Sequence, residues 1–296
     1  FIKRRIIRLH PMVVMGAVIG AIVFYFQGCP VWDVAKVTVG ALFVATFINA
    51  LLIPATPGTE IRGLGEMYPL NGPSWSLFFE YIGNILYALF IRKFSTAMLA
   101  LLVVVAGCAL AVFSIFGPYG DICAGFSLTG IEFTGGFFRL LYSFSAGLLL
   151  FRMFKPTHIK GAFWICSLAV IVLLAVPRLG GAGHLWMNGL YDTICFALLF
   201  PLIVYLGASG KITDRYTKRV CKFLGDISYP LYMVHYPFIY LYYAWVKNEE
   251  LTFGESLYGA LAVVIGSMLL AYICLKLYDE SVRKYLAGWF LKARNR

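Results

Sequence analysis

Charge is scarce in this sequence. Lysine, arginine, aspartate and glutamate together make up 13% of the 296 residues, whereas soluble domains usually contain about 25%. Hydrophobic residues make up 61% of the chain. This composition excludes an ordinary soluble domain and predicts an all-α fold, a multi-pass transmembrane helical bundle.

Several familiar kinds of site are also missing. No set of His, Cys, Asp or Glu has the spacing of a metal site, and the sequence has neither a glycine-rich phosphate loop nor a Gly-x-Ser-x-Gly elbow. The seven cysteines are odd in number and lie mostly in apolar runs, so they do not predict a disulfide framework. We therefore expect no metal and no permanently bound cofactor.

The positive charge does not point to nucleic acid. The formal net charge is +11, but lysine and arginine occur in short clusters between apolar runs. Such clusters are typical of cytoplasmic loops of membrane proteins. The expected surroundings are therefore a lipid bilayer, with no nucleic-acid partner.

Apolar runs that span or nearly span a bilayer follow one another along the whole chain. No internal repeat or soluble segment interrupts them, so we expect a single integral-membrane domain over residues 1–296. The runs cover residues 11–27, 35–53, 75–91, 97–116, 137–151, 162–177, 185–206, 227–246 and 256–278.

The basic clusters predict an orientation. From residue 92 onward they occur at every second connection, which places those connections and the C-terminus in the cytoplasm. The segment 54–74 then faces outward. Residues 3–8 are also basic and are therefore expected in the cytoplasm. Since the segment 54–74 lies on the opposite side, we expect one net crossing between residues 11 and 53. The prediction is about eight to nine membrane segments.

One acid lies inside the apolar run that follows the turn at Asn71. A carboxylate in a transmembrane segment costs at least about 2.5 kcal/mol, so Glu80 is expected to have a partner or a task. Ser76, Asn84 and Tyr87 share its helix face at spacings of four and three residues. The sequence therefore predicts a polar stripe that faces the inside of a bundle.

A second polar face is predicted in the segment FLGDISYPLYMVHYPF, residues 223–238. Asp226 or Ser228 is expected to cap a helix there, with a proline in its first turn. Ser228, Tyr232 and His235 then fall on one face. If the two helices start from opposite sides of a bilayer core of about 30 Å, Glu80 and His235 lie within about 10 Å of each other in depth. They are expected either to share one buried site or to satisfy each other structurally.

The N-terminal segment KRRIIRLHP, residues 3–11, is the most basic motif. Arg5 and Arg8 are three residues apart, so a helix would present both guanidinium groups on one face. Two interpretations remain open, a site for a phosphate-bearing ligand and a charge cluster that anchors the chain on the inside. Arg139 has a similar alternative, because it can reach the lipid headgroups from the edge of its segment.

Five motifs of this chain resemble, in the same order, those of the acyltransferase 3 family of integral-membrane O-acyltransferases. The resemblance covers nearly the whole chain. The motifs are KRRIIRLHP at 3–11, NGPSWSLFFE at 71–80, GFFRLLYSFSAGLLL at 136–150, LGDISYPLYMVHYP at 224–237 and YDESVRKYL at 278–286.

This resemblance implies an inner-membrane enzyme that transfers an acyl group, commonly acetyl from cytoplasmic acetyl-CoA, to a hydroxyl group. The acceptor would be a surface glycan, peptidoglycan, a lipid-linked sugar or a small molecule. Arg5 and Arg8 match the family's basic motif and would bind the acyl-CoA donor. Glu80 and His235 are expected to be catalytic. The residues expected to line the substrate path are Trp75, Ser76, Asn84, Arg139, Ser228, Tyr229 and Tyr232.

The chain also departs from the family. Family members begin with a helix that bears an arginine and a histidine ten residues apart, followed by a second helix, and neither is found before KRRIIRLHP. We therefore expect a truncated chain that lacks the histidine central to the family's chemistry, and both an active and an inactive fragment stay open. Restoring the two helices would give a total of about ten segments. A competing interpretation is a transporter or flippase of a sugar or lipid, since acids and prolines within the membrane also suit transport.

Overall fold

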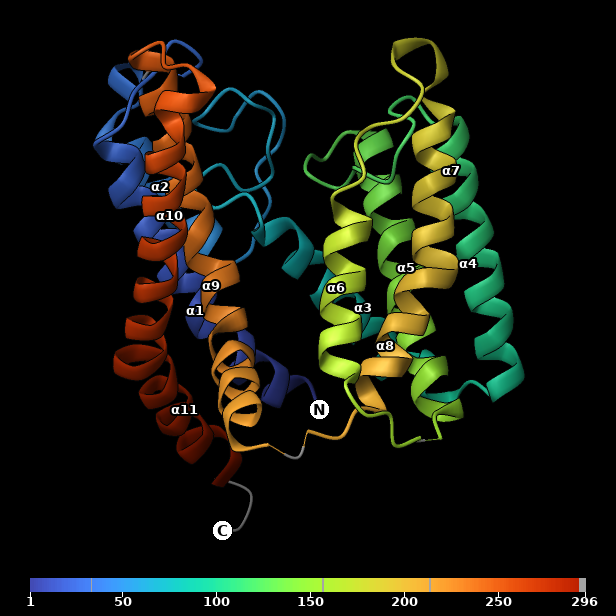
Figure 1. The fold of residues 1–296 in the computed structure, drawn as a ribbon. Coiled ribbons are helices and arrows are strands. Elements are labelled where there is room, and N and C mark those ends of the chain that lie inside the picture. The colour runs from blue at the N-terminus through green and yellow to red at the C-terminus, as the bar shows by residue number, and fades with distance from the viewer. Residues whose placement is uncertain (33, 156, 213, 293–296) are drawn as a thin grey trace. The chain divides into compact units, whose positions relative to one another are not determined.

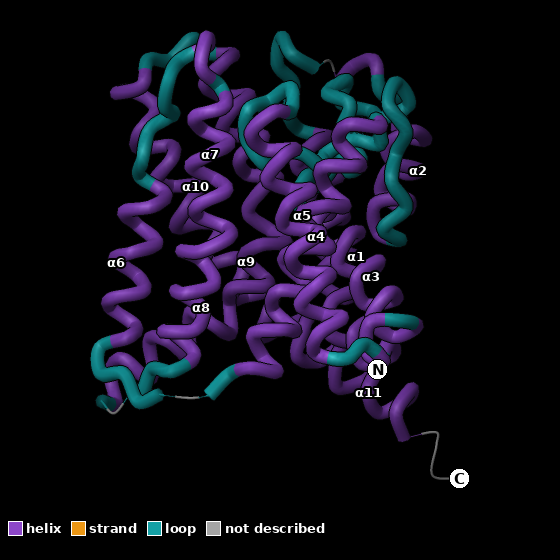
Figure 2. The backbone as a smooth tube through the Cα atoms, turned by 90° about the vertical axis from the view of Figure 1, so that its right-hand side faces the viewer, coloured by secondary structure: helices purple, strands orange, loops and turns teal. Residues whose placement is uncertain are grey.

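The computed structural model describes residues 1–32, 34–155, 157–212 and 214–292. Within these ranges the chain is built from helices and contains no strand (Figure 2). In chain order the elements are α1 (Ile2–Tyr25), η1 (Val34–Lys36), α2 (Val39–Ala50), α3 (Ser74–Leu89), η2 (Ile91–Lys93), α4 (Thr96–Phe116), α5 (Gly130–Met153), α6 (Ala162–Leu174), η3 (Ala182–His184), α7 (Trp186–Ile194), η4 (Cys195–Leu199), α8 (Phe200–Ala208), α9 (Arg215–Asn248), α10 (Phe253–Ile273), η5 (Cys274–Asp279) and α11 (Glu280–Lys292).

Within the described ranges, five stretches of helix are long and apolar enough to cross a membrane. They are Ile2–Tyr25, Thr96–Phe116, Gly130–Met153, Trp186–Ala208 and Phe253–Leu291. Helices α2 and α6 are apolar but shorter. The predicted fold class, an all-α multi-pass bundle, is therefore confirmed, while the number and direction of the crossings stay predictions.

The chain forms two compact units, which Figure 1 shows as two groups of helices. Unit 1 contains Phe1–Phe78, Phe126–Thr129 and Cys221–Arg296, and unit 2 contains Phe79–Gly125 and Gly130–Val220. Helices α3 and α9 each contribute residues to both units. The prediction of a single domain stays a prediction.

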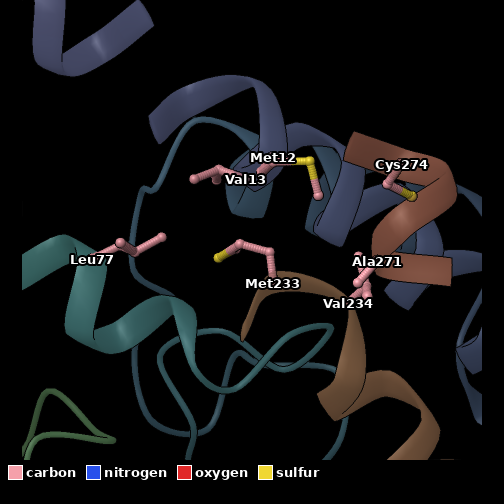
Figure 3. Packing of buried hydrophobic residues seen from close by; sticks show 7 residues of the cluster. All are labelled: Met12, Val13, Leu77, Met233, Val234, Ala271 and Cys274. Atoms are coloured by element: carbon pink, nitrogen blue, oxygen red, sulfur yellow. The ribbon is translucent and has the colours of Figure 1, made fainter. Parts of the chain in front are cut away.

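The core of unit 1 joins helices that are distant in the sequence (Figure 3). Met12 comes from α1, Leu77 from α3 and Met233 from α9, and each is almost fully buried. Ala271 and Cys274 extend the cluster to α10 and η5. The apolar faces of these helices thus hold together three of the motifs singled out in the sequence, those at 3–11, 71–80 and 224–237.

Two glycines of α1 allow the chain to pass close beside this helix. A Cβ atom at Gly20 would lie 2.2 Å from the carbonyl oxygen of Leu70, and one at Gly16 would lie 2.6 Å from that of Met233. Small residues spaced by four let backbones approach closely in membrane proteins. The pair therefore fixes the segment before α3 against α1.

A proline in α9 explains one hydrogen bond of this contact. Pro237 lacks an N–H group, so the carbonyl of Met233 loses its usual helical donor four residues later. The Asn71 side-chain amide donates to this oxygen instead, at 2.9 Å, and both residues are buried. The turn before α3 is thereby tied to the middle of α9.

Replacing Asn71 by alanine is expected to lower the free energy of unfolding by about 1 to 3 kcal/mol, because a buried carbonyl loses its donor. Thermal unfolding in detergent measures the effect. Adding Pro237→Ala to the Asn71→Ala variant returns an N–H group to the helix and should recover part of the stability. A double variant no more stable than the single one would contradict this account.

Unit 2 packs α4 against α5 and α7, and α8 against α5 and α6. Its apolar cluster includes Ala106, Leu110, Tyr142 and Phe196. Between α7 and α8 the helix widens into the π-turn η4, just before Pro201, whose ring nitrogen cannot donate a hydrogen bond. The Tyr142 hydroxyl donates to the Phe196 carbonyl of this turn at 3.1 Å.

The predicted start of the helix that carries His235 is wrong. Helix α9 begins at Arg215, and Asp214 accepts a hydrogen bond from the Thr217 N–H at 2.7 Å, as a capping residue does. Asp226 lies inside the helix, where its carboxylate pairs with Lys222 at 2.7 Å. Ser228 donates to the Gly225 carbonyl at 2.9 Å. Residue types that favour caps are here used for bonds within the helix.

Candidate functional site

Tyrosine hydroxyls join the predicted motifs in unit 1. Tyr229 of α9 donates to the carbonyl oxygen of Leu9 in α1 at 2.5 Å. Tyr232, one turn later, donates to the Pro73 carbonyl at 3.0 Å and lies 2.6 Å from the Ser76 hydroxyl at the start of α3. The structure thus brings together Tyr229, Tyr232 and Ser76 with the end of the basic motif.

The imidazole of His235 has a defined orientation. Its Nδ1 lies 3.0 Å from the carbonyl oxygens of both Leu231 and Tyr232, in the preceding turn of α9. A carbonyl only accepts hydrogen bonds, so Nδ1 carries the proton. In the neutral ring, Nε2 is then the atom with a free lone pair, which is the arrangement of a base.

Glu80 and Asn84 lie in the part of α3 that belongs to unit 2. The Asn84 side chain is buried, and its amide donates to the Glu80 carbonyl oxygen at 2.8 Å. Among the described residues of unit 2, no ion pair or hydrogen bond is made by the Glu80 carboxylate, which is half-buried. Because Glu80 and His235 belong to different units, their shared site stays a prediction.

Arg139 is held by a backbone contact within unit 2. Its Nη1 donates to the Ala124 carbonyl oxygen at 2.6 Å, in the segment that precedes α5. The Gly125 N–H of the same segment donates to the Glu132 carboxylate at 2.8 Å. Arg139 therefore fixes the connection between α4 and α5, and neither its substrate-lining role nor contact with headgroups is tested by this bond.

The basic motif lines a cavity of about 910 Å³. Arg5 is half-buried and Arg8 is exposed. Among its described lining residues, the cavity has four cationic side chains and no acid, together with two residues from the end of α11. The lining residues are Phe1, Lys3, Arg4, Arg5, Arg8, Phe290 and Leu291. Its volume is in the range of sites for small molecules and cofactors.

The structure separates the remaining predicted residues. Ser228 is exposed, and within the described residues its hydroxyl bonds only to a carbonyl of its own helix. Trp75 is half-buried, and its ring meets that of Phe126 at a centroid distance of 5.1 Å in an edge-to-face arrangement. Trp75 lines a cavity of unit 1, and Ser228 is not among the residues that line this cavity.

A buried arginine was not expected from the sequence. Arg62, in the segment between α2 and α3, is 1% exposed, and its Nε donates to the Pro69 carbonyl at 2.8 Å. The guanidinium carbon lies over three aromatic rings, 4.9 Å from the centroid of Phe24, 4.7 Å from Trp32 and 3.7 Å from Tyr240. Such contacts are worth about 2 kcal/mol or more when desolvated.

A second unexpected residue is Glu66. The ring of Tyr240 lies beneath the Arg62 guanidinium, and its hydroxyl donates to Glu66 Oε2. Burial raises the pKa of Glu66 above its ordinary value, while the Tyr240 hydrogen bond and the charge of Arg62 oppose that increase. Glu66 also lines a cavity of about 80 Å³. We call Arg62, Glu66 and Tyr240 the loop triad.

No local signal in the sequence marks the loop triad. The segment EIRGLGEMYP, residues 60–69, has the alternating charge and glycine content of a solvated loop. Only the packing of Phe24, Trp32 and Tyr240 around Arg62 shows that this charge is buried. These rings come from segments up to about two hundred residues away along the chain.

In the described part of the chain, no group of three or more His, Cys, Asp or Glu residues could hold a metal ion. Comparison with protein families gives one informative match. Residues 1–276 match the family model described as acyltransferase domain, that of the acyltransferase 3 family. Neither a curated protein nor a solved structure matches the chain in the corresponding comparisons.

Proposed function

Because this chain belongs to the acyltransferase 3 family, we propose that it is a membrane O-acyltransferase that uses acyl-CoA, with acetyl-CoA as the principal donor. The proposed acceptor is a hydroxyl of a surface glycan or of a lipid-linked sugar. The protein would lie in the inner membrane with its C-terminus in the cytoplasm, as its basic loops predict. No permanently bound cofactor is proposed.

The cavity of the basic motif is the observation that carries the donor assignment. Coenzyme A bears several phosphate charges, and arginine pairs with phosphate oxygens through two parallel hydrogen bonds. Arg5 and Arg8, with Lys3 and Arg4, concentrate positive charge around a volume of about 910 Å³. The predicted position at the cytoplasmic edge is also where acyl-CoA is available.

The proposed reaction moves one acyl group. The C–S bond of the thioester breaks as the acyl carbon bonds to the acceptor oxygen, the acceptor proton passes to a base, and a proton returns to the coenzyme A thiolate. His235 suits the base role through Nε2, because Nδ1 is engaged with backbone carbonyls. Glu80 would orient a reacting group.

Arg5→Gln and Arg8→Gln are each expected to weaken acetyl-CoA binding by about 10- to 100-fold, since each loses a charge-assisted hydrogen bond worth about 1.5 to 3 kcal/mol. Equilibrium binding of radiolabelled acetyl-CoA to the membrane-embedded protein measures this. Lys218→Gln, an exposed cation outside the cavity wall, is the matched control. Unchanged affinity in both arginine variants would leave the cluster as a membrane anchor.

The competing function, transport of a sugar or lipid, is separated by the product. Labelled acetyl-CoA supplied on the cytoplasmic side should yield acylated glycan in membranes that contain the protein and none in membranes that lack it. Movement of an unmodified sugar with no acyl transfer would favour the transporter and overturn the proposed function.

A further inference from the structure

The cavity beside Glu66 has the chemistry of a sugar site. Its wall combines one carboxylate with four aromatic rings, and Gly72 and Pro73 close one side. The rings belong to Trp75, Phe126, Tyr232 and Tyr236. Aromatic rings pack against the C–H faces of sugars, and a carboxylate accepts hydrogen bonds from hydroxyl groups. Both kinds of contact can bind a pyranose, and both are present within one unit.

The loop triad fixes the carboxylate and leaves one of its oxygens available. Oε2 of Glu66 accepts the Tyr240 hydroxyl, whereas Oε1 makes no hydrogen bond within the described residues of unit 1. Arg62 is in turn fixed by Pro69 and by the rings around it. The Tyr240 hydroxyl therefore holds the carboxylate of Glu66, while the Tyr240 ring packs against the fixed guanidinium of Arg62.

The charge balance favours a neutral ligand. Glu66 lies within the electrostatic range of Arg62 and of a second acid, Glu60, whose charges are opposite, and the guanidinium Nη1 and Nη2 have no hydrogen-bond partner in the described chain. What Glu66 lacks is a hydrogen-bond donor for Oε1 and not a counter-ion. An anion would be repelled by the carboxylate, and a free cation would compete with Arg62.

The size of the cavity limits what can enter. A volume of about 80 Å³ admits a few water-sized groups, so it suits one edge of a ring and not a complete oligosaccharide. Gly72 forms part of this wall. A Cβ atom at Gly72 would lie 2.8 Å from the Tyr236 ring, so a larger residue would crowd this ring. The basic loops predict that the segment 54–74 faces outward, where a surface glycan is accessible.

We propose that this cavity is the acceptor site, in which Glu66 Oε1 accepts a hydrogen bond from a hydroxyl of a sugar ring whose C–H face packs on Trp75. The assignment of the bound sugar as the acyl acceptor rests on the proposed function. Binding of a sugar in this cavity does not depend on that function. Glu66 and Arg62 act here in binding and positioning, and they take no part in breaking the thioester.

The test measures sugar binding and donor use separately on the protein in lipid nanodiscs. The sugar probes are the methyl glycosides of glucose, galactose, mannose and N-acetylglucosamine, followed by saturation-transfer NMR. We expect at least one glycoside to bind, and Glu66→Gln to weaken that binding about 10- to 100-fold by removal of a charged acceptor. Trp75→Leu should also weaken it, while Glu249→Gln, an exposed acid at the end of α9, should not.

Each outcome decides one claim. Acetyl-CoA binding that persists in Glu66→Gln, together with lost sugar binding, supports the acceptor site. Sugar binding that depends on Glu66 in a protein that neither binds nor consumes acetyl-CoA would keep the sugar site and overturn the proposed function. Acyl transfer without Glu66-dependent sugar binding, or binding of tetramethylammonium in place of all four glycosides, would overturn the sugar assignment.

Discussion

Replacing Glu80 by glutamine is expected to lower the rate of acyl transfer about 100- to 10 000-fold, the range for loss of a group that assists proton transfer. The substitution preserves shape and removes the charge. The helix itself should persist, because within unit 2 the structure uses the backbone of Glu80, through Asn84, and makes no ion pair with its carboxylate. Within the described residues of unit 2, no structural contact of the Glu80 carboxylate offsets the cost of placing an acid in this apolar helix.

The measurement is single-turnover transfer from labelled acetyl-CoA in membranes, with protein amount matched. Glu249→Gln removes an exposed acid and should retain the wild-type rate. If Glu80→Gln also transfers acyl groups at the wild-type rate, Glu80 is structural. A lower rate with unchanged affinity for acetyl-CoA would place its effect in the transition state and not in donor binding.

Replacing His235 by asparagine is expected to have an effect of the same size, about 100- to 10 000-fold, for a different reason. The asparagine amide can donate to the carbonyl oxygens of Leu231 and Tyr232, as Nδ1 of the imidazole does at 3.0 Å. The variant therefore retains the bond that orients the side chain and loses only Nε2, the atom that would accept a proton.

The control for this variant is His158→Asn, the same substitution at an exposed position outside the helices. It should transfer acyl groups at the wild-type rate. The thermal stability of His235→Asn should also stay near that of the wild type, since the helix-directed hydrogen bond is kept. Normal acyl transfer by a stable His235→Asn protein would exclude His235 as the base.

The sequence by itself determined the fold class and the family. Nine apolar runs were expected, and each corresponds to a helix or to helices joined by a π-turn. This agreement has a physical reason, because a chain in lipid must satisfy its backbone groups within each segment, so hydropathy and length alone predict helices. The same runs and five short motifs pointed to the family whose model matches residues 1–276.

Helix ends were decided by interactions that composition does not reveal. The sequence placed a cap at Asp226 or Ser228, but α9 starts at Arg215 because a basic extension continues the helix and Asp226 pairs with Lys222 inside it. The same residue types serve as caps and as partners within a helix. Local pattern cannot distinguish the two uses.

Tertiary structure alone decided where buried charge lies outside the helices. Arg62 and Glu66 belong to a segment with the composition of a solvated loop, and they are buried because Phe24, Trp32 and Tyr240 close over Arg62. The energy of this arrangement comes from aromatic faces supplied by α1, the segment after it and α9. Contacts between residues so far apart in the chain have no period or spacing, so no motif in the sequence predicts them.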